Sequence, residues 1–167
     1  SIAAFNKKNS VLKKGIALTP VKFGISFTLM HWNQAGALVH VYTDGSVHLN
    51  HGGTEMGQGL MVKVAQVVAN EFGLSLDRVK IMATSTAKVP NTSPTAASSG
   101  SDLNGMAARI AAETIHGRLV DFAAAAFGTP KDQIRFERGQ VMIGNTVLAF
   151  ADLVKRAYLA RVSLSST

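Results

Sequence analysis

The pattern of apolar and polar residues is clearest over residues 37–50, where the two kinds alternate on both sides of Asp44-Gly45. Such alternation around an Asp-Gly pair is typical of a β-hairpin with a two-residue turn. A two-residue turn makes His40 the partner of Leu49, which places His40 and His48 on opposite faces of the sheet. The pattern therefore predicts a hairpin and argues against a metal site shared by these two histidines.

Three segments, residues 60–72, 103–127 and 150–159, have the apolar spacing of amphipathic helices. Gly73 is the expected C′ residue of the first helix, and Ser101 or Asp102 can cap the second. Gly117 inside the second helix costs roughly 1 kcal/mol relative to alanine, which predicts a close packing contact there. The faces expected to be buried are Met61, Ala65, Val68 and Phe72; then Met106, Ile110, Ile115, Leu119, Phe122 and Ala126; and finally Leu153, Val154 and Ala157.

The remaining segments predict strands and one long loop. Residues 15–28 are interpreted as a strand with Phe23, Ile25 and Phe27 on one face, and residues 77–83 as another. Residues 133–147 predict a small hairpin around Gly139 with a second turn at Gly144-Asn145, and residues 161–167 begin a further strand. Residues 84–100, rich in Ser, Thr, Pro and Ala, form a loop long enough to be functional or disordered. The fold class is therefore α+β: a curled mixed or antiparallel sheet with packed helices.

Composition narrows the class of protein. The chain has 167 residues, 47% hydrophobic and 16% charged, which suits a single domain over residues 1–167 with a real core. It has no cysteine, which excludes disulfides, thiolate metal sites and iron–sulfur ligation within this chain. No run approaches the roughly 20 apolar residues of a membrane span. The pattern stops within the last predicted strand, and we interpret the chain as a fragment of a longer subunit.

The net charge of +7 is concentrated near the start, where residues 1–43 hold five lysines and no acidic residue. Such a segment suits either a nucleic-acid contact or a solvated surface that meets acidic parts of a larger protein. Aromatic residues are not interleaved with the lysines as base stacking requires, which favours the second interpretation. The five histidines are scattered and are expected to be structural or surface residues.

Residues 51–60 place four glycines between the hairpin and the first predicted helix. Glycine lets backbone N–H groups approach a ligand, and a helix N-terminus favours anionic or polar ligand groups. The alternative is a tight strand-to-helix connection without a ligand. The spacing matches neither Gly-x-Gly-x-x-Gly nor a loop ending in Gly-Lys-Ser/Thr, so a mononucleotide is not the expected ligand.

Residues 52–59, Gly-Gly-Thr-Glu-Met-Gly-Gln-Gly, resemble the pterin-facing loop of the xanthine dehydrogenase and aldehyde oxidase family of molybdenum hydroxylases. Other stretches resemble the same family in the right order: residues 22–28 its substrate-pocket strand, residues 33–37 with 42–47 its next hairpin, and residues 91–98 the loop under the metal. Residues 162–165 also fit. The resemblance covers most of the chain and is greatest to the xanthine dehydrogenases of the family.

The resemblance implies the molybdopterin-binding part of an enzyme that hydroxylates purines, hypoxanthine and xanthine to urate, with water as the oxygen source. It implies molybdenum held through the pterin, and iron–sulfur centres, FAD and NAD only in other domains or subunits. Cofactor contacts are expected at Gly57, Gln58, Gly59, Ala97, Ser98 and Ser99. Substrate contacts are expected at Phe27, Thr28, Ala96 and Ala97, whereas Phe23 is assigned to the core.

The resemblance also shows what this chain lacks. The family's catalytic glutamate lies in a Gly-Glu-Pro motif and its Gly-Phe-Gly-Gly motifs line the other side of the site, and neither occurs here. The fragment alone is therefore expected to be inactive, with the remainder of the molybdenum subunit and an iron–sulfur and FAD subunit as partners in an oligomeric cytoplasmic parent. Three alternatives stay open: an aldehyde oxidase-type hydroxylase, a basic module that binds nucleic acid or another anion, and a structural domain with a degenerate site.

Overall fold

The computed structural model describes residues 1–22, 24–88 and 92–167 and confirms the α+β class. An open mixed sheet has the strand order β3-β2-β1-β7, and a separate antiparallel sheet has the order β4-β5-β6. The strands are β1 (Ala37–Val41), β2 (Val47–His51), β3 (Val79–Ile81), β4 (Ile134–Glu137), β5 (Gln140–Ile143), β6 (Thr146–Ala149) and β7 (Ser165–Ser166). The helices are α1 (Ile2–Lys8), α2 (Leu60–Glu71), α3 (Gly100–Phe127) and α4 (Phe150–Leu159), with 3-10 turns at Met30–Trp32, Leu76–Arg78 and Lys131–Gln133.

The larger sheet is built on the predicted hairpin, because β1 and β2 pair antiparallel as the alternation requires. Val39, Val41, Val47 and Leu49 are fully buried on the face that meets the helices. Since β3 pairs parallel to β2, the chain must cross over between them, and α2 makes that crossover. The glycine-rich residues 52–59 are the strand-to-helix connection of this β2–α2–β3 unit.

The predicted register of the hairpin is wrong by one residue. Val41 pairs with Val47 and His40 with His48, so the two histidines lie on the same face of the sheet. Tyr42 N–H donates to Ser46 O and Gly45 has a φ of +77°, which is the geometry of a three-residue loop with a bulge. Despite this pairing, the described part of the chain holds no group of three or more side chains suited to a metal ion.

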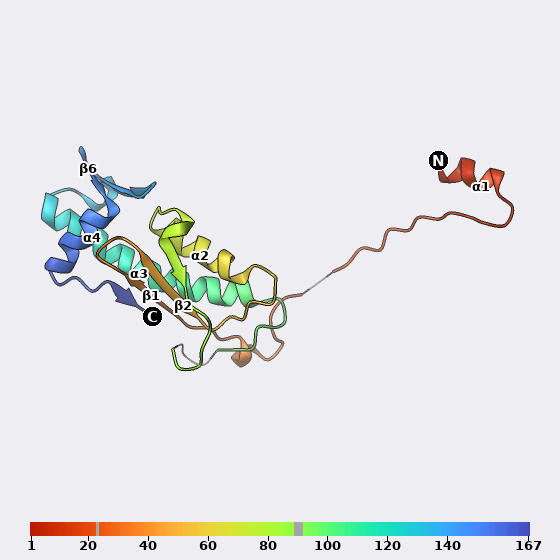
Figure 1. The fold of residues 1–167 in the computed structure, drawn as a ribbon, viewed down its shortest axis with the longest axis horizontal. Coiled ribbons are helices and arrows are strands. Elements are labelled where there is room, and N and C mark those ends of the chain that lie inside the picture. The colour runs from red at the N-terminus through yellow and green to blue at the C-terminus, as the bar shows by residue number, and fades with distance from the viewer. Residues whose placement is uncertain (23, 89–91) are drawn as a thin grey trace.

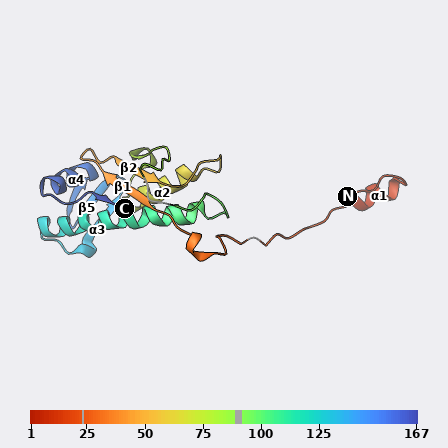
Figure 2. The same cartoon turned by 90° about the horizontal axis from the view of Figure 1, so that it is seen from below.

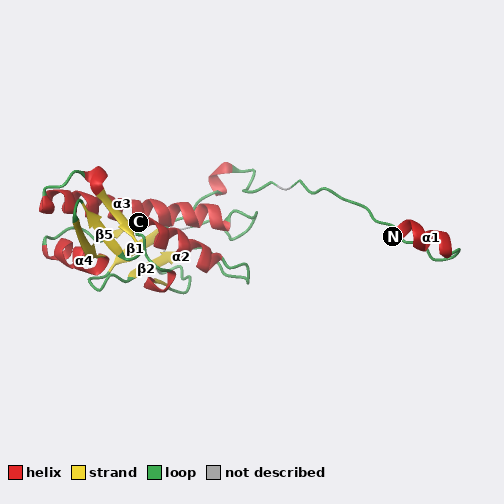
Figure 3. Cartoon of the chain, turned by 90° about the horizontal axis from the view of Figure 1, so that it is seen from above, coloured by secondary structure: helices red, strands yellow, loops and turns green. Residues whose placement is uncertain are grey.

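Helices α2 and α3 pack together beside the sheet, and α3 runs along its length (Figures 2 and 3). The buried stripe of α2 is confirmed at Ala65, Val68 and Phe72, while Met61 lies half-buried at its edge. The buried residues of α3 are Asn104, Gly105, Ala108, Ala111, Ala112, Ile115, Leu119 and Ala123.

The predicted stripe of α3 is therefore wrong in its first half, where Met106 and Ile110 are 51% and 54% exposed. The helix turns its small residues inward, because α2 and β1 approach closely there and leave no room for long side chains. Phe122 is half-buried and Ala126 is exposed. Gly117 makes no close packing contact: an added Cβ would meet no described atom within 4 Å.

The smaller sheet confirms the predicted turns at Gly139 and Gly144-Asn145, and α4 buries Leu153, Val154 and Ala157 as expected. Gly73 is the C′ residue of α2 with a φ of +62°, and Leu74 N–H donates to Ala69 O at 2.8 Å. Strand β7 pairs with β1, which confirms a further strand near residue 165.

The expected strand over residues 15–28 is wrong. Within the described residues this stretch is extended but pairs with no other strand, and Val21 and Ile25 are exposed. Ser26 has a φ of +75°, which breaks the predicted alternation. Phe23 and Asn91, which carried predictions, lie outside the described residues. Figure 1 shows α1 at the end of an arm that extends away from the body.

Candidate functional site

The glycine loop (residues 52–59) leaves the sheet at His51, a fully buried residue at the end of β2. The Gly53 N–H donates to His51 Nδ1 at 3.0 Å, and the Thr84 hydroxyl donates to Gly53 O at 2.7 Å. A Cβ on Gly53 would lie 2.6 Å from Leu60 Cδ2 and 2.9 Å from Asn104 Nδ2. Glycine at position 53 therefore lets the base of the loop pack against Leu60 and Asn104, and hydrogen bonds to His51 and Thr84 hold it.

Burial lowers the pKa of His51, and its Nδ1 accepts a hydrogen bond, so the neutral ring carries its proton on Nε2. That Nε2, Asn50 Oδ1 and Asn104 Oδ1 are buried without hydrogen-bond partners in the described part of the chain. Buried polar atoms are usually paired with protein groups, waters or ions, so each exception calls for a partner. Three of the four such atoms belong to residues at or against the base of the glycine loop.

The tip of the loop is organised by its own side chains. The Glu55 carboxylate accepts the N–H groups of Gly57 and Gly59 at 2.9 Å and of Met61 at 3.0 Å. These bonds, that from Met61 foremost, lower the pKa of Glu55. The Gln58 amide accepts Met56 N–H at 2.5 Å and donates to Thr54 O at 2.9 Å. Three of the N–H groups of the loop and of the start of α2, which were expected to face a ligand, are thus occupied by Glu55.

Residues 92–99, the second loop of the site, contact the other motifs. Thr54 N–H donates to Thr95 Oγ1 at 2.8 Å, and Ser26 N–H donates to Ala97 O at 3.0 Å. Gln34 N–H donates to Ser93 Oγ at 3.0 Å. The second loop therefore joins the glycine loop to the segments around residues 26 and 34. Both of these segments are far from the second loop in the sequence.

Backbone strain is concentrated at the same junction. Ser26, Ala97 and Ser98 have φ values of +75°, +52° and +55°. A residue with a side chain in this left-handed region costs roughly 1–2 kcal/mol, and such residues persist only where the surroundings hold them. Strain of this kind is often found at ligand sites, and here it occurs where the second loop contacts the segment around Ser26.

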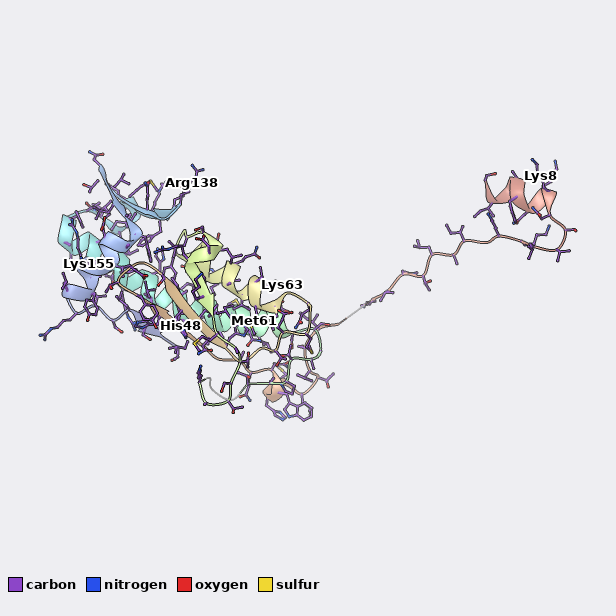
Figure 4. The ribbon with its side chains drawn as sticks, in the orientation of Figure 1. Lys8, His48, Met61, Lys63, Arg138 and Lys155 are labelled. Atoms are coloured by element: carbon purple, nitrogen blue, oxygen red, sulfur yellow. The ribbon has the colours of Figure 1, made fainter. Side chains whose placement is uncertain are left out.

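A hollow of about 380 Å³ lies between the glycine loop and the start of α3. Its lining residues are Met56, Gln58, Leu60, Lys63, Thr95, Ala96, Ser98, Gly100 and Ser101. Figure 4 shows Met61 and Lys63 on the first turns of α2 beside this loop. Cβ atoms on Gly57 and Gly59 would meet no described atom within 4 Å, so the loop backbone faces open space. The lining offers the hydroxyls of its serine and threonine residues, the amide of Gln58 and the positive charge of Lys63. These groups fit a ligand with a polar ring system and an anionic group, as a molybdopterin has.

A second hollow of about 330 Å³ is lined by Phe27, His31, Trp32, Gln34, Thr92, Ser93 and Pro94. Phe27 is half-buried, and the Trp32 ring meets it edge-on with centroids 5.8 Å apart. The Asn33 side chain accepts Phe27 N–H and donates to Phe27 O, both at 2.9 Å. The Phe27 ring is thus held at the edge of an apolar hollow and not within the core.

Four of the nine predicted site residues line these two hollows. Gln58, Ala96 and Ser98 line the first, and Phe27 lines the second, with the exposed Thr28 next to it. Ser99 is different: it is buried, and both its N–H and its hydroxyl donate to Ala96 O. A larger hollow of about 750 Å³, between the end of α2, the smaller sheet and α4, contains none of the predicted residues.

Sequence reasoning missed four residues that hold the site in shape, Asn33, Thr95, Asn104 and, above all, Glu55, whereas His51 is structural as expected. Glu55 and Asn33 lie inside motifs that the sequence analysis recognised. For Glu55, a carboxylate among glycines at the start of a helix was a sign that it could bind the N–H groups there. His51 bonds Gly53, only two residues further along the chain, whereas Asn104 lies against Gly53 from α3, a distant contact that no local pattern marks.

A family model described as the molybdopterin cofactor-binding domain matches residues 1–167. The chain therefore belongs to the family of molybdopterin cofactor-binding domains. It is 46% identical to the xanthine dehydrogenase of Drosophila pseudoobscura pseudoobscura and 47% identical to the xanthine dehydrogenase/oxidase of Gallus gallus, in each case over 99% of this chain and 11% of the relative. It is 55% identical to the Mus musculus xanthine dehydrogenase/oxidase over 72% of this chain and 9% of the relative. The chain thus spans about a tenth of the length of these relatives.

Solved structures share its fold. The Cu,Mo-CO dehydrogenase superposes with a TM-score of 0.70 at 20% identity, over 80% of this chain and 18% of that chain. Quinoline 2-oxidoreductase from Pseudomonas putida 86 superposes with a TM-score of 0.67 at 24% identity, over 79% and 18%. At these identities the likeness shows the fold alone. Across the described residues, no helix is both long and apolar enough to cross a membrane.

Proposed function

We propose that this chain forms one wall of the active site of a xanthine dehydrogenase-type molybdenum hydroxylase that oxidises hypoxanthine and xanthine to urate. The observation that carries the proposal is the contact of the second loop with both the glycine loop and the Phe27 segment, each of which lines a hollow together with the second loop. The identity of 46–47% to xanthine dehydrogenases over nearly the whole chain favours purine over aldehyde as substrate.

In this proposal the hollow beside the glycine loop receives the molybdopterin. The open backbone at Gly57 and Gly59 lets the cofactor approach, while Gln58 and Ser98 present an amide and a hydroxyl. Ala97 leaves space because its side chain is a single methyl group, and Ser99 supports the second loop from beneath. The cofactor supplies the redox chemistry, which is the hydroxylation of an activated carbon with oxygen from water.

The substrate binds at the second hollow. The Phe27 ring contacts the flat heteroaromatic ring by its edge or face, and the Thr28 hydroxyl forms a hydrogen bond to it. Ala96 and Ala97 form the small-residue wall between substrate and cofactor. The general base is a glutamate outside this chain, and electrons leave through iron–sulfur centres and FAD in other parts of an oligomeric cytoplasmic parent.

The basic residues of the folded body support this assignment over a nucleic-acid module, because those labelled in Figure 4 lie apart from one another. Figure 4 shows Lys8 on the distant α1, Lys63 on α2, and Arg138 and Lys155 on other parts of the body. A nucleic-acid surface gathers its cations into one patch or groove. Near the start of the chain, Lys13 Nζ donates to Asn6 O and Asn9 O at 2.6 Å, which engages that lysine locally.

The test is elemental analysis and urate formation by the purified full-length parent. We expect stoichiometric molybdenum and xanthine-dependent urate production. Gln58→Ala should lower the molybdenum content or the turnover, whereas Gln66→Ala, which changes an exposed glutamine of α2, should change neither. A parent without molybdenum, or with molybdenum but only aldehyde oxidation, would overturn the purine hydroxylase proposal. Wild-type molybdenum content and turnover in Gln58→Ala would remove Gln58 from the cofactor site.

A further inference from the structure

The Glu55 side chain bridges the tip of the glycine loop and the first turn of α2. One carboxylate oxygen accepts N–H groups from Gly57 and Gly59, and the other accepts the N–H of Met61. N–H groups at a helix N-terminus are those that bind phosphates and carboxylates from ligands. Here the chain supplies its own anion, so the glycine loop is folded around a charge that belongs to it.

The glycine loop needs such a bridge because its backbone has few other restraints at the tip. Gly57 and Gly59 have φ values of +93° and +76°, and an added Cβ at either would meet no described atom within 4 Å. Glycine loses more conformational freedom on ordering than any other residue. Packing therefore cannot select one conformation for these two residues, whereas three charge-assisted hydrogen bonds to one carboxylate can.

Gln58 stands between the two glycines and depends on the same bridge. Its amide bonds Met56 N–H and Thr54 O, both within the glycine loop, and it lines the hollow assigned to the cofactor. If the Gly57 and Gly59 backbone moves, the position of Gln58 moves with it. The shape of the cofactor-facing wall is thus linked to Glu55, whose carboxylate lies on the helix side of the loop.

We propose that Glu55 is a positioning residue that holds residues 56–59 in the shape that receives the cofactor. This proposal rests on the proposed function of the glycine loop. Glu55 acts through the backbone of Gly57 and Gly59 and through Gln58, and it takes no part in the chemical step. Its hydrogen bonds are local to the loop and the first turn of α2, so the hydrophobic core does not depend on them.

The experiment uses the full-length parent and two substitutions. Glu55→Gln keeps the side-chain length but removes the charge and one acceptor oxygen. Glu55→Asp keeps the charge but is one methylene shorter, so it cannot reach all three N–H groups. The control is Asp152→Asn, which neutralises another exposed carboxylate in the first turn of a helix, α4.

The first measurement is hydrogen exchange of the peptide covering residues 54–62, which needs no catalytic activity. We expect exchange roughly tenfold faster in Glu55→Gln, the ratio for loss of about one charge-assisted hydrogen bond, with Glu55→Asp between it and wild type. Peptides of the core and the Asp152→Asn control should exchange as in wild type. Unchanged exchange of residues 54–62 in Glu55→Gln would overturn the proposal.

The second measurement separates positioning from simple stabilisation. Glu55→Gln should lower the molybdenum content or the kcat per bound molybdenum, while the KM for the purine and the Tm of the cofactor-free protein stay near the wild-type values. A lower Tm with normal molybdenum content and normal kcat would make Glu55 a structural cap and overturn the proposal. If the wild-type parent contains no molybdenum, the proposed function fails, and the exchange measurement still decides whether Glu55 orders the glycine loop.

Discussion

Phe27 provides the most direct test of where the substrate binds, because core and pocket assignments predict different losses on truncation. Its ring is half-buried at the edge of a 330 Å³ hollow and meets Trp32 edge-on at 5.8 Å. Phe72 is the matched control, since its ring is fully buried and packs 5.7 Å from Phe150. Phe23, the control that the strand pattern alone suggests, lies outside the described residues.

The expected magnitudes follow from these surroundings. Phe72→Ala leaves a cavity in a closed core and should cost about 3–5 kcal/mol. Phe27→Ala removes one edge-to-face contact, which is worth about 0.5–1.5 kcal/mol, together with partial burial. At about 2–4 °C per kcal/mol for a chain of this size, Phe72→Ala should lower the Tm by roughly 6–20 °C and Phe27→Ala by only a few degrees.

The assays are thermal unfolding of the chain followed by circular dichroism, and steady-state oxidation of xanthine by the full-length parent. Phe27→Ala should raise the KM or lower the kcat of a parent whose fold is intact, because the substrate ring loses its aromatic contact. Equal losses of Tm in both variants, together with normal xanthine turnover in the Phe27→Ala parent, would refute the assignment of Phe27 to the substrate hollow.

Three further predictions test the rest of the structure. Gly73 and Gly128 both follow a helix with φ near +62°, but a Cβ on Gly73 would lie 2.4 Å from Phe136 O, whereas one on Gly128 meets no described atom within 4 Å. In urea unfolding of the chain, Gly128→Ala should therefore cost about 1–2 kcal/mol and Gly73→Ala clearly more, and equal costs would contradict the close contact. Burial lowers the pKa of His51, so near and below pH 6.5 the folded chain binds fewer protons than the unfolded chain. The free energy of unfolding should therefore be constant with respect to this residue above about pH 6.5 and should decrease as the pH falls below that value. His51→Gln should make this decrease smaller. An identical pH profile in His51→Gln would show that this ring does not titrate on unfolding. Expressed alone, the chain should fold without molybdenum, because one wall cannot enclose a cofactor, and stoichiometric metal by elemental analysis would contradict this.

The hairpin shows where local pattern stops being sufficient. Alternation and the Asp44-Gly45 pair correctly predict the hairpin, because side-chain alternation and turn chemistry are properties of neighbouring residues. The register is off by one because the Asp44 carboxylate accepts the N–H and hydroxyl of Ser46, while Arg78 binds Asp44 O and Ala151 packs on Gly45. Arg78 and Ala151 are distant in the sequence, so the pairing of His40 with His48 was not predictable from the hairpin alone.

For the helices too, the sequence predicts the positions, while the tertiary structure decides which face is buried. Their positions follow from apolar spacing and from glycine at their ends, and α4 begins and ends at the predicted residues. Which face of α3 is buried depends on its neighbours: α2 and β1 approach so closely that alanines fill the contact while Met106 and Ile110 remain exposed. A strict preference for large apolar residues inside fails where two backbones are close.

The motifs by themselves were enough to identify the family, because several stretches with its residue types follow one another in the right order. Tertiary structure decided how these motifs act together. Only folding brings Thr54 to Thr95 and Ser26 to Ala97, and only folding leaves Asn104 against Gly53. The sequence pattern shows which hydrogen-bonding groups each loop contains. Which distant residues these groups bond depends on where the folded core places the loops.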